Sequence, residues 1–211
     1  MRHLASLAGL AALCWSAAAL AAGPSGVTPP PDVDAFSKLA IRAEADDQGV
    51  DFRALRQAWL DSAQRRGAPN LDPLRQRLNA AVQARQDAQI REIARQIVSA
   101  DYVDLPAHFQ LRQACTRLGD KACADHEHFV EFGLLDSITK NGAGTAIETA
   151  WPVVSIDEEY FILGMIGAVL RQQSLLQRNG RAYDAMEVTM PNGSDVVFYF
   201  DIAAFYGREL G

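Results

Sequence analysis

The sequence predicts an α+β fold, in which N-terminal tetratricopeptide-like helical hairpins pack with a C-terminal three- to four-stranded antiparallel meander and one helix. Two observations predict this order of elements. Apolar residues recur at helical spacing across residues 51–138. Beyond them, Asn-Gly dipeptides at residues 179–180 and 192–193 separate runs with strand-like alternation. The apolar fraction is 49% of 211 residues, which is enough for a hydrophobic core.

The first residues have the pattern of a secretory signal peptide. Arg2 supplies a positive start, residues 4–20 are apolar and rich in alanine, and residues 19–21 are small enough for signal peptidase. We expect a signal peptide over residues 1–22 and a flexible Pro/Gly-rich linker over residues 23–34. A retained membrane anchor is the alternative, but serine and glycine interrupt the apolar segment and no basic residues follow it. The mature protein is therefore expected to be periplasmic or secreted, with no membrane span after signal cleavage.

A helical repeat-like region is expected over residues 35–140. Two predicted helix pairs are related by an offset of 33 residues, which aligns Pro73 with Pro106 and Leu78 with Leu111. This offset is one residue short of the tetratricopeptide period. Each helix has an acid at or near its start and an apolar face. The expected starts are Asp51, Asp72, Asp87, Asp104 and Asp120.

An α+β region is expected over residues 141–211. The apolar run at residues 150–154 contains Pro152, which suits an edge strand. Ser155 and Glu158 form a capping box, which predicts a helix from about residue 156 to 167. Its inward-facing side chains are expected to be Tyr160, Phe161 and Leu163. The three strands of the meander are expected at residues 173–178, 181–190 and 195–202.

The cysteines are expected to form a structural disulfide. Cys14 lies in the predicted signal peptide, so Cys115 and Cys123 remain as a pair in an oxidising compartment. They lie four residues on either side of Gly119, where the helical hairpin is expected to turn, so they should face each other. The spacing differs from the C-x-x-C pattern of redox proteins.

Histidines are the candidates for chemistry. His126 and His128 are two residues apart on a predicted helix, so they point away from each other, and Val130 breaks the H-E-x-x-H pattern. We therefore expect no metal site and no cofactor, and we interpret His126 as packed in the seam between helices. His108 and His128 are the candidates for functional use, each with a nearby acid.

Other motifs are interpreted as structural. The acids at residues 157–159 fall in a first helical turn, where they complement the helix dipole. The segment at residues 141–145 lacks the lysine of a phosphate-binding loop, and the sequence contains no G-x-S-x-G motif. With a net charge of -6 and no run of basic residues, nucleic acid is excluded as an expected partner.

Several segments carry a family resemblance. They are "HFQLRQACTRLGD", "FGLLDSI", "GAGTAIETAWPVVSIDEEYFILGMIG", "QQSL", "YDAMEV" and "VVFYFDIAAFYG". Through these segments the chain resembles the bacterial secreted proteins catalogued as domain of unknown function 4919, and the likeness covers roughly residues 51–206. The resemblance implies tetratricopeptide-like helices, a small C-terminal sheet and export, and it implies no activity.

We interpret the chain as an exported, non-enzymatic module that binds a protein or peptide of the cell envelope, because helical repetition occurs here without a catalytic constellation. The alternative is a periplasmic hydrolase or metal-dependent enzyme with a site between the helices and the sheet. Convergence of His108, His126 and an acid in one pocket would favour the enzyme.

Overall fold

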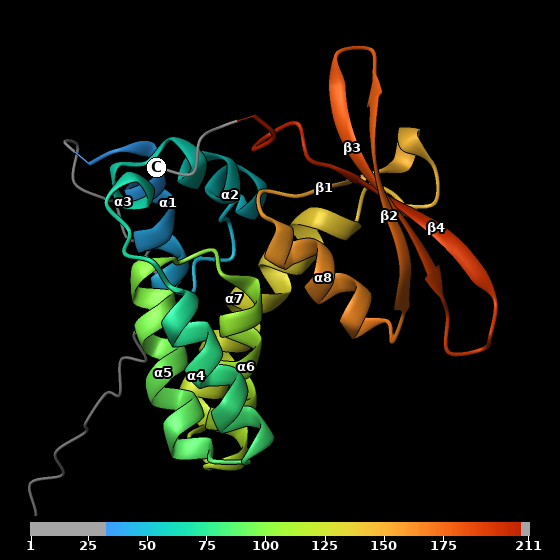
Figure 1. Cartoon of the computed structure of the whole chain (residues 1–211). Helices are drawn as coiled ribbons and strands as arrows, with labels where there is room; N and C mark the ends of the chain where they lie inside the picture. Colours follow the sequence, from blue (N-terminus) through green and yellow to red (C-terminus); the bar gives the residue numbers. More distant parts are fainter. Residues whose placement is uncertain (1–32, 208–211) are drawn as a thin grey trace, which may run out of the picture.

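Helices and sheet lie side by side in the structure, a computed structural model that describes residues 33–207 (Figure 1). The predicted signal peptide and most of the predicted linker lie outside the described residues. The helices are α1 (Ala35–Glu44), α2 (Phe52–Asp61), α3 (Ala63–Arg66), α4 (Asp72–Gln83), α5 (Asp87–Ala100), α6 (Leu105–Arg117), α7 (Lys121–Thr139) and α8 (Ile156–Met165), with a 3-10 turn at Ile147–Thr149. The strands are β1 (Trp151–Pro152), β2 (Val169–Arg178), β3 (Arg181–Thr189) and β4 (Asp195–Asp201). The predicted α+β class is therefore confirmed.

Aspartate side chains begin several helices. Asp51, Asp104 and Asp120 accept hydrogen bonds from the backbone N–H three residues further on, at 3.0, 2.9 and 3.2 Å, as predicted. Asp72 and Asp87 do not cap their helices, because each is already the first helical residue. Their carboxylates still lie in the first turn, where they complement the helix dipole.

The chain departs from the predicted helices at Ser62. This residue is extended and separates α2 from α3, because its hydroxyl donates to the Trp59 carbonyl at 2.8 Å and accepts from the Arg65 N–H at 3.0 Å. Helix α1 was not among the predicted helices. It packs the buried ring of Phe36 against Trp59, with ring centroids 5.1 Å apart.

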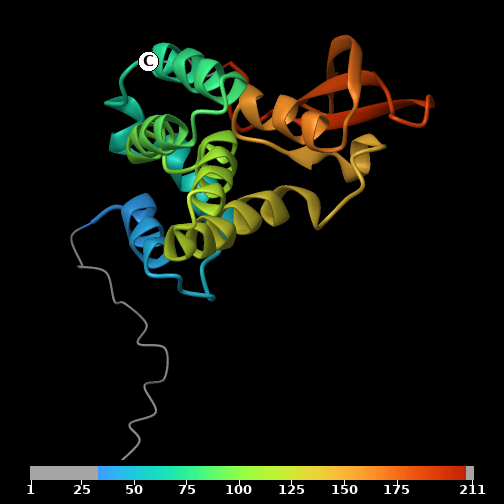
Figure 2. The same ribbon diagram turned by 90° about the horizontal axis from the view of Figure 1, so that it is seen from below.

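Helices α4 to α7 form two successive antiparallel hairpins that pack against each other (Figures 1 and 2). Helix α2 contacts α7, and α8 contacts both α6 and β2, so α8 lies between the hairpins and the sheet. One continuous core therefore connects the two parts; it includes Leu55, Ile93, Ile97, Leu111, Leu134, Ile162, Met186 and Phe200. No helix among the described residues is both long enough and apolar enough to cross a membrane.

The sheet has the strand order β1-β4-β3-β2 and is mixed, whereas the sequence predicted a purely antiparallel meander. Strands β2, β3 and β4 are antiparallel neighbours, but β1 pairs parallel with β4, with Trp151 opposite Phe200. The three strands that follow α8 place β4 next to β1, and β4 runs in the same direction as β1. The turn between β2 and β3 is built as predicted, because Asn179 and Gly180 both have positive φ, of 52° and 74°.

Helix α8 faces the core with a different set of side chains from the predicted one. Tyr160 was predicted to point inward and is exposed, so that prediction is wrong. The buried positions of α8 are Glu158, Glu159, Ile162 and Leu163. Two adjacent carboxyl groups therefore enter the core, each in a different environment.

Candidate functional site

A buried ion pair connects α8 to α2. Arg56 donates to the Glu158 carboxylate from Nε at 2.8 Å and from Nη2 at 2.5 Å, and both side chains are 1% exposed. The same guanidinium donates to Ser137 Oγ at 3.1 Å and to the Pro152 carbonyl at 2.9 Å. Glu158 also accepts the N–H of Val154 at 2.8 Å. Charge and hydrogen-bonding capacity are thus matched inside the core, as a buried pair requires.

The predicted capping box is only half formed as a result. Ser155 Oγ accepts the Glu158 N–H at 3.3 Å. The Glu158 carboxylate binds Arg56 and the N–H of Val154, whereas a capping box would direct it to the N–H of Ser155. The acid assigned from sequence to a helix end therefore also connects the two parts of the fold.

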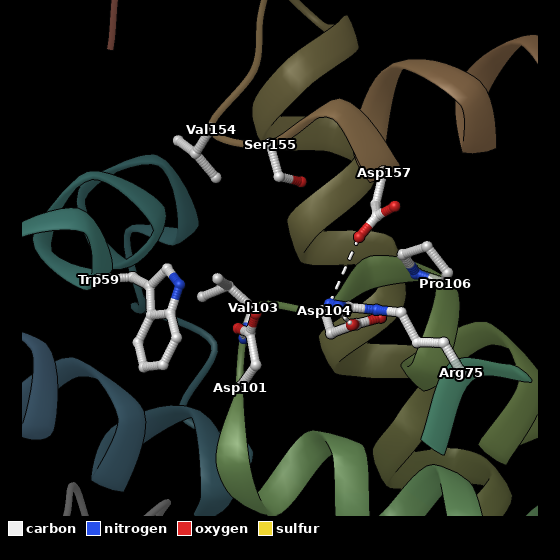
Figure 3. Close-up of a pocket in the computed structure, with 9 residues that line it drawn as sticks. All are labelled: Trp59, Arg75, Asp101, Val103, Asp104, Pro106, Val154, Ser155 and Asp157. Atoms are coloured by element: carbon white, nitrogen blue, oxygen red, sulfur yellow. Dashed lines mark hydrogen bonds and ion pairs between the residues drawn. The ribbon is translucent and has the colours of Figure 1, made fainter. Parts of the chain in front are cut away.

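A small acidic pocket lies where α4, the α5–α6 connection and the start of α8 meet (Figure 3). Arg75 donates to Asp104 at 2.7 Å and pairs with Asp157 at 3.3 Å. Asp101 accepts the N–H of Val103 at 3.1 Å. The cavity volume is about 20 Å³, which is room for a single water molecule.

Two carboxyl groups of the acidic pocket, those of Asp101 and Asp157, have raised pKa values. Burial raises the pKa of Asp101 to about 7, and the neighbouring charge of Asp104 adds to the shift. Burial also raises the pKa of Asp157, against the opposing effect of Arg75. Asp101 can therefore exchange a proton near neutral pH, but a cavity of this size has no room for an organic substrate beside it.

Glu159 is a second carboxyl group with unusual surroundings. It is fully buried, and neither of its carboxyl oxygens has a hydrogen-bond partner among the described residues. Burial raises its pKa to about 8, and the charges of Asp184 and Glu158 add to the shift. Burial likewise raises the pKa of Asp184, which accepts a hydrogen bond from Gln173 at 2.7 Å. Glu159 is therefore mainly protonated at pH 7.

His108, a predicted candidate, is fully buried between α6 and α7. Nδ1 lies 2.6 Å from Glu127 Oε2, and Nε2 lies 2.9 Å from the Tyr102 carbonyl oxygen. Burial disfavours the charged ring, but the hydrogen bond to Glu127 and its charge outweigh burial, so the pKa of His108 is raised. Both ring nitrogens face acceptors, which favours the protonated form of the ring, and the side chain is fully buried.

The other two histidines lie elsewhere. His126 is partly buried, and its Nδ1 lies 2.8 Å from Asp46 just beyond α1, so it is not enclosed in the seam between α6 and α7. His128 is exposed, with its ring centroid 6.0 Å from that of Phe132. Within residues 33–207 the three histidines share no pocket, so the convergence that would favour the enzyme is absent there.

The structure places Cys115 and Cys123 at disulfide-bonding distance, with Sγ atoms 2.07 Å apart and Cα atoms 5.9 Å apart. Asp120 lies close to both sulfur atoms, within 4.8 Å. Because bonded sulfurs offer no thiolate, this cluster is not a metal site in its oxidised form. In the described part of the chain, no other three His, Cys, Asp or Glu side chains come that close together.

A larger, open groove lies between α2 and α7, with a volume of about 510 Å³. Phe52 and Phe129 form its apolar wall in an edge-to-face pair, with ring centroids 5.4 Å apart. Phe132 is 61% exposed at the rim. At Gly133 any Cβ would overlap the Phe52 ring, so glycine allows Phe52 to lie directly against α7. We call this surface, made by Phe52, Phe129, Phe132 and Gly133, the aromatic groove.

A second groove of about 380 Å³ lies on another side of α2, between that helix and the chain after β4. Arg53 and Arg181 contribute to its lining, and Arg181 is paired with Asp201. Arg53 lines both grooves and has no hydrogen bond or ion pair within the described residues. A free guanidinium therefore stands at the junction of the two grooves.

Sequence reasoning found neither Arg56 nor the aromatic groove. Phe129 and Phe132 are three residues apart on a helix, which is a weak indication of a shared aromatic face. Their partner Phe52 belongs to a helix far away in sequence, so no local pattern could have connected the three.

Fold and surface together define an α+β protein in which helical hairpins adjoin a small mixed sheet and the described residues carry open grooves. The chain belongs to the family described as Domain of unknown function (DUF4919), which matches residues 62–209. The resemblance stated from the sequence is thereby confirmed. Helices α1 and α2 precede the matched residues, so one wall of the aromatic groove lies outside the family match. No curated protein and no solved structure matches the chain.

Proposed function

We propose that this protein is an exported binding module that holds a peptide segment of an envelope protein in the aromatic groove. The observation that carries the proposal is the largely exposed Phe132 beside an open groove of about 510 Å³ with aromatic walls. This volume is in the range that ligands occupy in proteins. Large apolar side chains in solvent at such a groove are typical of interaction surfaces.

The groove determines the chemistry of its ligand. The exposed Phe132 and the partly buried Phe129 offer apolar surface to a large aliphatic or aromatic side chain, and the buried Phe52 ring packs against Phe129. At the rim, Asp136 is already paired with Lys140 at 3.1 Å, whereas Arg53 is free to bind a carboxylate. The ligand that fits is a peptide with one large apolar residue and an acidic residue next to it.

Export is part of the proposal and has two supports. The first is the signal-peptide pattern over residues 1–22. The second is the cysteine pair at bonding distance, since structural disulfides persist mainly in oxidising compartments. A partner in the periplasm or outside the cell follows from both.

The enzyme alternative has no support of this kind in the described residues. Asp101 has a pKa suited to proton transfer, but the acidic pocket has room only for a water molecule. His108 is enclosed by protein, and His128 stands in solvent without an acid at hydrogen-bond distance in the described structure.

Selection from a random peptide library on the immobilised protein tests the proposed function. We expect enrichment of peptides with a large apolar residue, and about tenfold weaker binding of these peptides to a Phe132→Glu variant. A Leu118→Glu variant is the matched control, because Leu118 is also an exposed large apolar residue but lies outside the groove. No enrichment, or equal loss of binding in both variants, would overturn the proposal.

A further inference from the structure

Strand β2 forms an open edge of the sheet. It has ten residues, it is the outermost strand, and β3 pairs with one of its sides only. Pairing with β3 is regular over residues 172–178 and irregular between Leu170 and Gln172. On the side away from β3, alternate N–H and C=O groups therefore have no strand partner in the described structure, as in any edge strand. The opposite edge offers much less, because β1 has two residues and one is Pro152.

The charge of β2 is opposite to that of the chain. Its sequence, VLRQQSLLQR, contains two arginines and no acid, in a chain with a net charge of -6. Arg171 is exposed and has no ion pair among the described residues, while Arg178 binds Glu148 at 2.9 Å near the surface. Two copies joined through β2 would bring four arginines together, and only the two Arg178 side chains have an acid, Glu148, beside them. An acidic partner strand is therefore favoured over a second copy.

Apolar side chains accompany the open edge on the side of α8. The Tyr160 hydroxyl donates to Gln173 at 3.0 Å, which places α8 beside this face of β2. Leu175 lies two residues further along and so points to the same face. Both Tyr160 and Leu175 are exposed. An added strand would thus find apolar contacts at Tyr160 and Leu175 for side chains that it places on this face.

We propose that β2 binds an extended acidic segment of a partner protein by strand addition. Backbone groups of the segment pair with the open side of β2 over residues 172–178. Its apolar side chains contact Tyr160 and Leu175, and its carboxylates lie near Arg171 at the start of the paired stretch and near Arg178 at its end. This surface lies on the sheet, apart from the aromatic groove, so it provides a second and independent binding mode.

The test uses the full mature chain and a fluorescent peptide of four Glu-Val repeats, measured by fluorescence anisotropy. We expect saturable binding that is lost when alternate amides of the peptide are N-methylated, because strand addition needs their N–H groups. A peptide of four Lys-Val repeats should not bind. An Arg171→Glu variant should bind the acidic peptide about tenfold more weakly.

Two control variants make the result specific. Arg77→Glu changes an exposed arginine of α4 without an ion pair in the described structure, and it should leave binding unchanged. Phe132→Glu should also leave it unchanged, which separates this surface from the aromatic groove. The proposal is overturned by absence of binding, by equal binding of the N-methylated peptide, or by equal losses in the Arg171→Glu and Arg77→Glu variants. If the chain self-associates and Arg171→Glu alters that self-association, the segment that pairs with β2 is a second copy of the chain, and the proposal of an acidic partner segment is overturned.

Discussion

Replacement of Arg56 by methionine removes the positive half of the buried ion pair. The variant loses four hydrogen bonds, two to Glu158 and one each to Ser137 and Pro152. The Glu158 carboxylate then stays buried with only the Val154 N–H as a partner. Breaking such a pair from one side costs about 3–5 kcal/mol of folding free energy. For a domain of this size, that corresponds to a fall in melting temperature of roughly 6–20 °C.

A double-mutant cycle measured by urea unfolding at pH 7 isolates the pair. The Arg56→Met/Glu158→Met double variant should recover much of the lost stability, because no unpaired charge remains and the site becomes apolar. Arg53→Met is the matched control, since Arg53 lies on the same helix, is exposed and has no partner within the described residues; its effect should be about 0.5 kcal/mol or less. The reasoning is refuted if Arg56→Met is no more harmful than Arg53→Met, or if the two core substitutions are additive.

Three further substitutions test the packing and the titration of the core. Burial raises the pKa of Glu159 in the folded state to about 8, against an ordinary 4.5, so the contribution of Glu159 to folding stability falls as pH rises between these values. Glu159→Gln should remove this fall and stabilise the protein at pH 8 by on the order of a few kcal/mol. Unchanged pH dependence in urea unfolding would contradict this expectation. A Cys115→Ser/Cys123→Ser variant should be about 2–3 kcal/mol less stable than the oxidised wild type in thermal unfolding. Its stability should equal that of the reduced wild type, which would show that the disulfide bond is responsible for the difference. Gly133→Ala should destabilise by about 1–3 kcal/mol, because the new methyl group must displace the Phe52 ring, and a more stable variant would show that the ring moves freely.

Local patterns in the sequence predicted much of the fold. Asp51, Asp104 and Asp120 cap helices as expected, and the turn at Asn179 and Gly180 forms the hairpin that the dipeptide indicates. These signals involve residues within a few positions of each other, so the chemistry of one turn decides them. Assignment of the C-terminal segment to strands followed from the same kind of local evidence.

Contacts between distant residues were beyond such reasoning. Arg56 and Glu158 are 102 positions apart, and nothing near Arg56 marks it as buried. The capping box suggested a surface role for Glu158, and the rotation of α8 that buries Glu158 and Glu159 also exposes Tyr160. The parallel pairing of β1 likewise depends on where three later strands return.

The same limit applies to the candidate site. His108 and His128 were selected for the chemistry of the imidazole ring, but the fold encloses the first and leaves the second in solvent. The aromatic groove depends on Phe52 meeting α7 at Gly133, a contact that only the tertiary structure reveals. Whether each of these residues can contact a ligand depends on its burial and its neighbours in the fold more than on its residue type.

The most direct test of the proposed function is site-specific photo-crosslinking in cells of the native host. Benzoylphenylalanine at position 132 should form a discrete adduct with an envelope protein, and the adduct should map to a segment with a large apolar residue. The same group at position 118, on an exposed site away from the groove, should form no such adduct. Identical products from both positions, or none from position 132, would contradict the assignment of the aromatic groove as the binding surface.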